Sequence, residues 1–355
     1  MEPGTDATHA LDWQSLTTSG TVVSDTVQSK TGPRSIKCSS PATPAAAYVK
    51  LTAVLANAGR RWSVYYRFSD LPSSDTAIMQ IKSTAGNDRF QLRLRTGGSL
   101  DAHFGAAANN GTDVLSINTW YRITVSYTVT STSVSEWRVF VNGTLDITVS
   151  NPTLAGTTLD DLFLGWCVSP GNETDIWIDD EYGDDGSTLD DIASDVRITY
   201  KAPTAVNLNE FDTTNGSGAV NERPVNAANG MQHDASTDKH QTYGLQSRAT
   251  GDVDITWGTV IALCAFGNVQ RVGTGGTGTA ALTLNGVDYT TTFSTAAGIV
   301  TKYLTTPTYP TDASTIGVKS TATTADTILN DCGVLVAYTP GAAPNVIGPF
   351  PTFRH

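Results

Sequence analysis

The chain of 355 residues is 39% apolar and 16% charged, which is typical of a folded globular protein and excludes a disordered polyelectrolyte. Its net charge of −12 argues against nucleic acid as a partner, because a hold on phosphates needs a surplus of lysine and arginine. No apolar run reaches the ~20 residues that span a bilayer, and the first residues lack the basic and apolar regions of a secretion signal, so we expect a protein made in the cytoplasm without membrane insertion.

Alternating apolar and polar residues predict strands in the first half of the chain. The clearest segments are 61–68, 90–95 and 120–130. In each, every second residue is apolar, as in an antiparallel strand with one face in a core and the other in water. The expected core residues are Trp62, Val64, Tyr66 and Phe68, then Phe90, Leu92 and Leu94, then Tyr121, Ile123, Val125, Tyr127 and Val129; the expected wet positions of the last strand are Arg122, Thr124, Ser126 and Thr128.

Asn-Gly dipeptides predict two tight hairpins, because both residues tolerate the positive φ angles of a two-residue turn. Asn142-Gly143 separates a strand over 136–141 from one over 144–149. Asn285-Gly286 separates two further strands in the second half. Strands joined in this way pair antiparallel.

The composition changes near residue 200. After a strand over 175–182 comes an acidic run, and the stretch 203–237 is rich in Asn, Gly and Thr. Strand signals then resume near Tyr243 with no helices between them, which favours a second sandwich over any βαβ fold. We therefore predict an all-β protein of two β-sandwich domains, over 1–200 and 201–339, followed by an extended Pro-rich C-terminal arm over 340–355 that lies on a neighbouring subunit or folds back on its own domain.

Four segments resemble, in order, the strands of the concanavalin A-like or laminin-G-like (LamG-like) jelly roll. They are Trp120-Tyr121-Arg122-Ile123-Thr124-Val125, Arg138-Val139-Phe140-Val141-Asn142-Gly143, Leu162-Phe163-Leu164-Gly165 and Ile176-Trp177-Ile178-Asp179-Asp180. Upstream, Lys30-Thr31-Gly32-Pro33-Arg34-Ser35-Ile36 is similar to an early strand of the same family. The resemblance covers residues 8–185 and implies that the first domain is a jelly roll.

The second half, residues 205–340, resembles a sandwich that follows such jelly rolls in bacteriophage structural proteins. The likeness rests on 234–240 leading into Tyr243, on 259–268 and on 331–338. It implies a viral structural protein made in the bacterial host cytoplasm and placed on the virion surface, either tail-associated or decorating the head. Its partners would be other virion proteins, copies of itself and host surface glycans. A carbohydrate-active enzyme and a free lectin are the alternatives of another class.

One strand segment bears on glycoside hydrolysis. Related folds place carboxylates at i, i+2 and i+4 of one strand, so that an acid and a nucleophile face the same bond. Here Glu173-Thr174-Asp175-Ile176-Trp177 has Trp177 where the second Glu would stand. Neither a nucleophile elbow nor a Cys-His motif replaces the missing pair. We predict no catalytic residues and a chain that is not an enzyme.

Metal and cofactor sites have little support. The acidic pairs Asp160-Asp161, Asp179-Asp180 and Asp184-Asp185 offer oxygen ligands for calcium, but without a calcium loop a solvated acidic rim is favoured. The glycine run 273–278 matches a dinucleotide fingerprint, but strand-like residues follow it. The other sets are His233, Asp234, Asp238 and His240 in a polar loop, and the scattered cysteines Cys38, Cys167, Cys264 and Cys332, which are interpreted as buried apolar residues. We expect no cofactor and no metal ligand, and calcium is the ion to test.

Tyr65, Arg67, Arg93 and Arg95 occupy the polar faces of the strands over 61–68 and 90–95. An aromatic ring and guanidinium groups can stack on a sugar or pair with an acidic neighbour. We take these four residues as the candidate contact surface, with ordinary solvated strand faces as the alternative interpretation.

Overall fold

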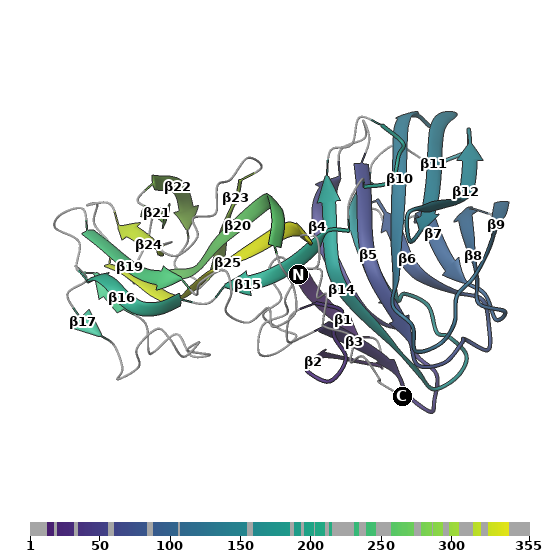
Figure 1. Ribbon diagram of the computed structural model, residues 1–355, viewed down its shortest axis with the longest axis horizontal. Helices are drawn as coiled ribbons and strands as arrows, with labels where there is room; N and C mark the ends of the chain where they lie inside the picture. The colour runs from purple at the N-terminus through teal and green to yellow at the C-terminus, as the bar shows by residue number, and fades with distance from the viewer. Residues whose placement is uncertain are drawn as a thin grey trace, which may run out of the picture.

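The computed structural model of the protein is all-β, with no helix in the residues that it describes (Figure 1). The predicted fold class is therefore confirmed.

The Pro-rich arm from residue 341 onward falls outside those residues, so its role stays a prediction. No helix in the described ranges could cross a membrane. These ranges are 13–17, 20–31, 35–55, 60–83, 88–105, 107–154, 159–184, 188–192, 195–201, 203–209, 213–214, 231–233, 239–245, 257–272, 278–285, 287–293, 298–304, 315–320 and 326–340.

Two seven-stranded antiparallel sheets, here called sheet A and sheet B, form the first sandwich (Figure 1). Sheet A has the order β1 (Trp13–Thr17), β4 (Ala47–Leu55), β13 (Leu159–Trp166), β6 (Thr76–Lys82), β7 (Asp88–Leu94), β8 (Ser99–Phe104), β9 (Ala107–Val114). Sheet B has the order β12 (Thr144–Ser150), β11 (Val134–Val141), β10 (Tyr121–Ser131), β5 (Arg60–Phe68), β14 (Thr174–Asp184), β3 (Ser35–Ser40), β2 (Thr21–Asp25). Because β14 pairs with both β3 and β5, the last strand closes the sandwich between two early ones, as in a jelly roll.

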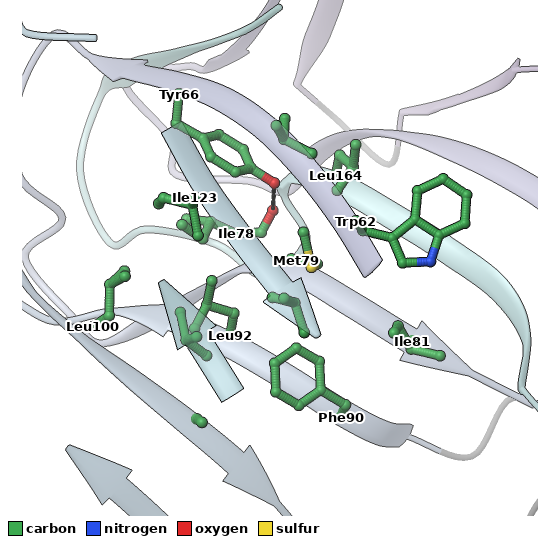
Figure 2. Close-up of a cluster of buried hydrophobic side chains, with 14 of the residues drawn as sticks. Trp62, Tyr66, Ile78, Met79, Ile81, Phe90, Leu92, Leu100, Ile123 and Leu164 are labelled. Atoms are coloured by element: carbon green, nitrogen blue, oxygen red, sulfur yellow. Dashed lines mark hydrogen bonds between the residues drawn. The ribbon is translucent and has the colours of Figure 1, made fainter. Parts of the chain in front are cut away.

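The core of this sandwich lies between the two sheets and holds the apolar residues expected from the alternation, with Tyr121 half-buried beside it. Trp137 of β11 stacks on Tyr127 and on Phe90, with ring centroids 4.3 and 4.7 Å apart. The Tyr66 hydroxyl donates to the carbonyl of Ile78 across the core at 3.2 Å (Figure 2). Burial of apolar surface stabilises a protein by about 25 cal/mol per Å². Aromatic rings bury the largest areas, so their packing does much to hold the two sheets together.

The second half forms two more antiparallel sheets, sheet C and sheet D. The Asn285 turn joins two paired strands as predicted, with φ of +52° at Asn285. The longest strand of sheet C, β20 (Trp257–Val272), pairs with β25 (Asp326–Pro340) with register shifts between Trp257 and Ala262. Sheet C holds β17 (Thr213–Thr214), β18 (Met231–His233), β25 (Asp326–Pro340), β20 (Trp257–Val272) and β23 (Gly298–Leu304), with β15 (Arg197–Lys201) paired to β25; sheet D holds β16 (Pro203–Asn209), β19 (Lys239–Leu245), β24 (Thr315–Ser320), β21 (Gly278–Leu284) and β22 (Val287–Phe293).

The outer face of sheet B is covered where the sequence predicted water. Thr124 and Ser126 of β10 are 1% and 0% exposed. The chain that follows β14 crosses this face: Arg122 donates to the carbonyl of Ile192 at 3.0 Å, and Ser126 donates to that of Thr188 at 3.4 Å. The prediction of a wet side was wrong because alternation identifies the polar face of a strand but not what packs on it.

Three cysteines behave as the sequence predicted. Cys38, Cys167 and Cys332 are buried thiols that take part in no disulfide. Burial raises the pKa of the Cys38 thiol, which keeps it in the unreactive protonated form. The side chain of Cys264 lies outside the described residues.

Candidate functional site

The four residues predicted as a contact surface lie on two different sheets. Tyr65 and Arg67 belong to β5 in sheet B, whereas Arg93 lies on β7 in sheet A and Arg95 follows the end of that strand. Their side chains alternate with core residues of the same strands, so the two pairs point to opposite sides of the sandwich. They therefore do not form one surface.

Tyr65 is not exposed, because the chain beyond β14 packs over it. The side chain is 6% exposed, and its hydroxyl donates to Asp195. Lys30 Nζ and Arg197 Cζ stand 5.1 and 5.0 Å from the ring centroid. Burial, together with the hydrogen bond to Asp195, raises the pKa of the Tyr65 phenol. The prediction of an exposed ring at Tyr65 is therefore corrected: this ring has a structural role.

Sheet A carries a second polar face, on the side of the sheet away from the core. Alternation with core residues identifies its side chains: Phe90, Leu92 and Leu94 of β7 point inward, so the residues between them point outward. The same holds on the four other central strands. We call this surface the β4–β8 face and define it by Tyr48 and Lys50 (β4), Asp161 and Phe163 (β13), Gln80 and Lys82 (β6), Arg89, Gln91 and Arg93 (β7), and Asp101 and His103 (β8).

The register of the strands aligns five of these side chains in one transverse row. Lys50 is opposite Phe163, which is opposite Gln80; Gln80 is opposite Gln91, which is opposite His103. Adjacent strands lie about 4.8 Å apart, so the row crosses about 19 Å of the sheet. Gln80, Gln91 and Phe163 are buried in the row, whereas Lys50 and His103 at its two ends are partly exposed. The two ends can therefore hydrogen-bond an extended ligand.

Phe163 is the aromatic centre of the face. Lys50 and Lys82 place their ammonium groups 5.5 and 5.1 Å from the centroid of its ring, and Tyr48 meets it edge-on at 5.4 Å. Lys50 also pairs with Asp161, with Nζ 2.9 Å from Oδ2. Cation–π contacts and this ion pair fix the two lysines over the ring, so their charges have defined positions on the sheet.

On β7 a guanidinium group is held in place by an amide. Arg93 donates through Nε and Nη2 to Oε1 of Gln91, at 2.8 and 2.6 Å. Beside them, Asp101 accepts from the backbone N–H of Asn109 at 3.0 Å. The arrangement is rigid and rich in donors, and it can bind hydroxyl or carboxylate groups.

The segment considered for glycoside hydrolysis has a structural role on sheet B. Trp177 of β14 is 6% exposed and donates from Nε1 to Asp25 at 2.6 Å. Asp175 pairs with Lys37 at 2.8 Å. Burial alone would raise the pKa of Asp25, but the hydrogen bond from Trp177, backbone hydrogen bonds and the charge of Lys37 lower it overall. These groups support one another and leave no acid and nucleophile pair on this strand.

One of the acidic pairs considered for calcium, Asp179-Asp180, serves as a pair of internal acceptors. Asp179 accepts from the backbone N–H groups of Lys30 and Thr31, and Asp180 from the hydroxyl of Thr31 and the N–H of Ile198. Burial, and for Asp179 the neighbouring charge of Asp180, raises the pKa of both carboxyl groups. The interpretation of this pair as a solvated rim was wrong, because both are buried.

No group of three or more His, Cys, Asp or Glu gathers around a metal-sized space within the described ranges. His233 lies on β18 in sheet C and His240 on β19 in sheet D, while 234–238 fall outside those ranges. Residues 273–277 of the glycine run fall outside the described ranges, and its last residue, Gly278, begins β21.

Comparison with known proteins finds neither a matching family model nor a matching curated protein. Solved structures do share the fold. Cellulose induced protein Cip1 is 17% identical, with a TM-score of 0.41 over 50% of this chain and 92% of its own. An endo-β-1,4-glucuronan lyase from the fungus Trichoderma reesei is 12% identical, with a TM-score of 0.41 and coverage of 50% and 91%. The alginate lyase AlgAT5 is 9% identical, with a TM-score of 0.38 and coverage of 49% and 94%. At these identities the likeness concerns the fold alone.

These structures correct the prediction that the chain is not an enzyme. Lyases and a sialidase are among the solved structures to which this chain is similar. The prediction considered carboxylates spaced along one strand, a nucleophile elbow and a Cys-His motif. Proton transfer also uses His, Lys or Tyr, which the prediction left out.

Sequence reasoning found Arg93 on the β4–β8 face and missed its neighbours. Alternation in 76–82 and 88–94 was a usable signal for Gln80, Lys82 and Gln91. No local signal joins them to Lys50 or Phe163, because these come from strands far apart in the sequence.

Proposed function

We propose that this chain is a bacteriophage virion structural protein whose jelly roll contacts host glycans through the β4–β8 face. The observation that carries the glycan contact is the transverse row Lys50, Phe163, Gln80, Gln91, His103, which comes from five adjacent strands. Amide, imidazole and ammonium groups hydrogen-bond sugar hydroxyls, and rigid strands hold them at fixed spacing. On the outer face of sheet B the chain beyond β14 packs over Tyr65, Thr124 and Ser126. On the β4–β8 face Gln80, Gln91 and Phe163 are also buried, but Lys50, Lys82, Arg93 and His103 are partly exposed and can reach a ligand.

The glycan contact is tested by affinity electrophoresis of the full chain in gels containing a panel of neutral and acidic polysaccharides. We expect retardation in at least one polymer, and His103→Ala should weaken that binding about tenfold, the effect of losing one hydrogen bond of about 1.4 kcal/mol. Thr148→Ala, at an exposed position of β12 in sheet B, is the matched control and should leave binding unchanged. Migration unaltered by every polymer would contradict the proposal.

The virion assignment rests on the likeness of residues 205–340 to phage sandwiches. A tail-associated position is the one we favour, with the head surface as the alternative. Antibodies against the chain should label one fixed position on purified particles from the strain that encodes it, as seen by electron microscopy. Particles that lack the chain by mass spectrometry would overturn this part of the proposal without affecting the glycan test.

A further inference from the structure

The β4–β8 face has a charge opposite to that of the whole chain. Its cationic side chains outnumber its acidic ones, whereas the formal net charge of the protein is −12. The cations come from three strands, so the excess is not the property of one turn or one loop. The cations are Lys50, Lys82, Arg89 and Arg93, and the acids are Asp101 and Asp161.

Two guanidinium groups on β7 carry most of this imbalance. Arg89, Gln91 and Arg93 share one side of the strand, about 6.7 Å apart from one to the next. Arg93 donates to the neutral amide of Gln91, and Asp101 lies opposite it on β8. Within the described part of the chain, no carboxylate pairs with either arginine.

Arg89 provides the second, independent observation. The residue is only 6% exposed, and its Nε and Nη1 atoms are buried without a hydrogen-bond acceptor. A buried guanidinium with unmet donors is costly unless an anion supplies the missing acceptors. Arg89 lies two residues from Gln91 on the same side of β7. Its unpaired N–H donors are therefore next to the transverse row.

We propose that the β4–β8 face selects an acidic polysaccharide, with sugar carboxylates paired to Arg89 and Arg93 and ring hydroxyls bonded to His103. The planar fork of a guanidinium matches the two oxygens of a carboxylate. Along β7 two guanidinium groups, Arg89 and Arg93, flank the amide of Gln91. Two cations at this regular spacing can pair with successive carboxylates of one polymer. This inference rests on the proposed glycan contact and adds the class of ligand.

The test compares two forms of one polymer, polygalacturonate and its methyl ester, which share the same backbone but differ in charge. Binding of the full chain to each is measured by titration calorimetry at low and at high salt. We expect the ionised polymer to bind at least about tenfold more tightly, and salt to weaken that binding because screening reduces interactions between exposed charges.

Variants assign the effect to the face. Arg93→Gln should lower the affinity for polygalacturonate about tenfold, while Arg93→Lys, which retains the charge but not the fork, should lose less. Arg138→Gln on β11 in sheet B removes the same charge from a partly exposed side chain that pairs with Glu136, and should leave binding unchanged. Melting temperatures confirm that each variant is folded.

The two proposals fail differently. If the acid and the ester bind equally and His103→Ala weakens both, the glycan contact stands and the selection of carboxylates is wrong. If Arg138→Gln weakens binding as much as Arg93→Gln, the attraction comes from overall charge and the site is wrong. If no polymer of the neutral and acidic panel binds, the glycan contact itself is contradicted.

Discussion

Trp177 lies on the outer face of sheet B. It occupies the position at which related glycoside hydrolases would have their second carboxylate. The guanidinium of Arg67 packs over its ring at 4.9 Å and the ammonium of Lys37 at 5.4 Å. Its Nε1 donates to Asp25. One residue thus connects β14 to its neighbours β5 and β3 and to β2 beyond. Trp177 therefore has a structural role, because its ring and its Nε1 contact Arg67, Lys37 and Asp25.

Trp177→Phe should lower the free energy of unfolding by about 2 kcal/mol near neutral pH, because it removes a hydrogen bond to a charged carboxylate. The pKa of Asp25 is lowered in the folded state. Its contribution is present above the unfolded pKa and is lost as pH falls through the folded one, so the cost should shrink in acid. Urea unfolding at neutral and acidic pH measures this. In an Asp25→Asn background the same change should cost clearly less, and an equal cost would count against the pairing.

At the scale of elements, β13 depends on a close approach to β4. Gly165 has φ of +120°, and a Cβ there would lie 2.7 Å from the carbonyl oxygen of Ala47 and 3.0 Å from Cys38 Sγ. Backbone of β4 and a buried side chain of sheet B therefore leave no room for a methyl group. This contact positions Phe163, two residues earlier on the same strand, over which Lys50 and Lys82 lie.

Gly165→Ala should destabilise the protein by about 3 kcal/mol, from backbone strain and overpacking together. It should also weaken polysaccharide binding, since β13 carries Phe163. Thermal unfolding and the gel assay measure the two effects. Gly97→Ala is the control: it sits in the turn between β7 and β8 with no atom within 4 Å of the added Cβ and should change neither quantity.

At the scale of the whole molecule, a buried charge network lies where the first sandwich leads into sheet C. Arg197, the first residue of β15, donates to Thr31 at 3.0 Å and to Asp195 at 2.6 Å, and its Nη1 lies 3.6 Å from Asp180. Beside it, an apolar cluster joins both halves through Ile192, Val196, Ile198 and Ala337. The passage between the sandwiches is therefore packed and hydrogen-bonded.

Arg197→Met should cost about 3 kcal/mol of stability at neutral pH, because it leaves Asp180 buried without its cation. Burial raises the pKa of Asp180 even with the arginine present. As pH falls through that pKa the carboxyl group takes up a proton and no longer needs the cation, so the cost should decrease in acid. Chemical denaturation across this pH range is the measurement. Arg138→Met breaks a partly exposed pair with Glu136 and should cost no more than about 1 kcal/mol; equal costs for both variants would contradict the role of Arg197.

The sequence by itself determined the local features of this protein. The all-β class, the inward faces of 61–68, 90–95 and 120–130, and the turn at Asn142-Gly143 all follow from residue alternation and turn chemistry. Asn142 and Gly143 have φ of +50° and +92°, as such a turn requires. These features depend on a few adjacent residues, so they can be predicted without the fold.

Only the tertiary structure decided which polar faces are surfaces. Tyr65 and Arg93 look equivalent in the sequence, yet the chain after β14 covers Tyr65, whereas Arg93 is partly exposed on the β4–β8 face of sheet A. Alternation fixes the side of a strand on which a residue lies, but it contains no information on which distant strand pairs with it or in which register. Lys50, Gln80 and His103 therefore come together through strand pairing alone.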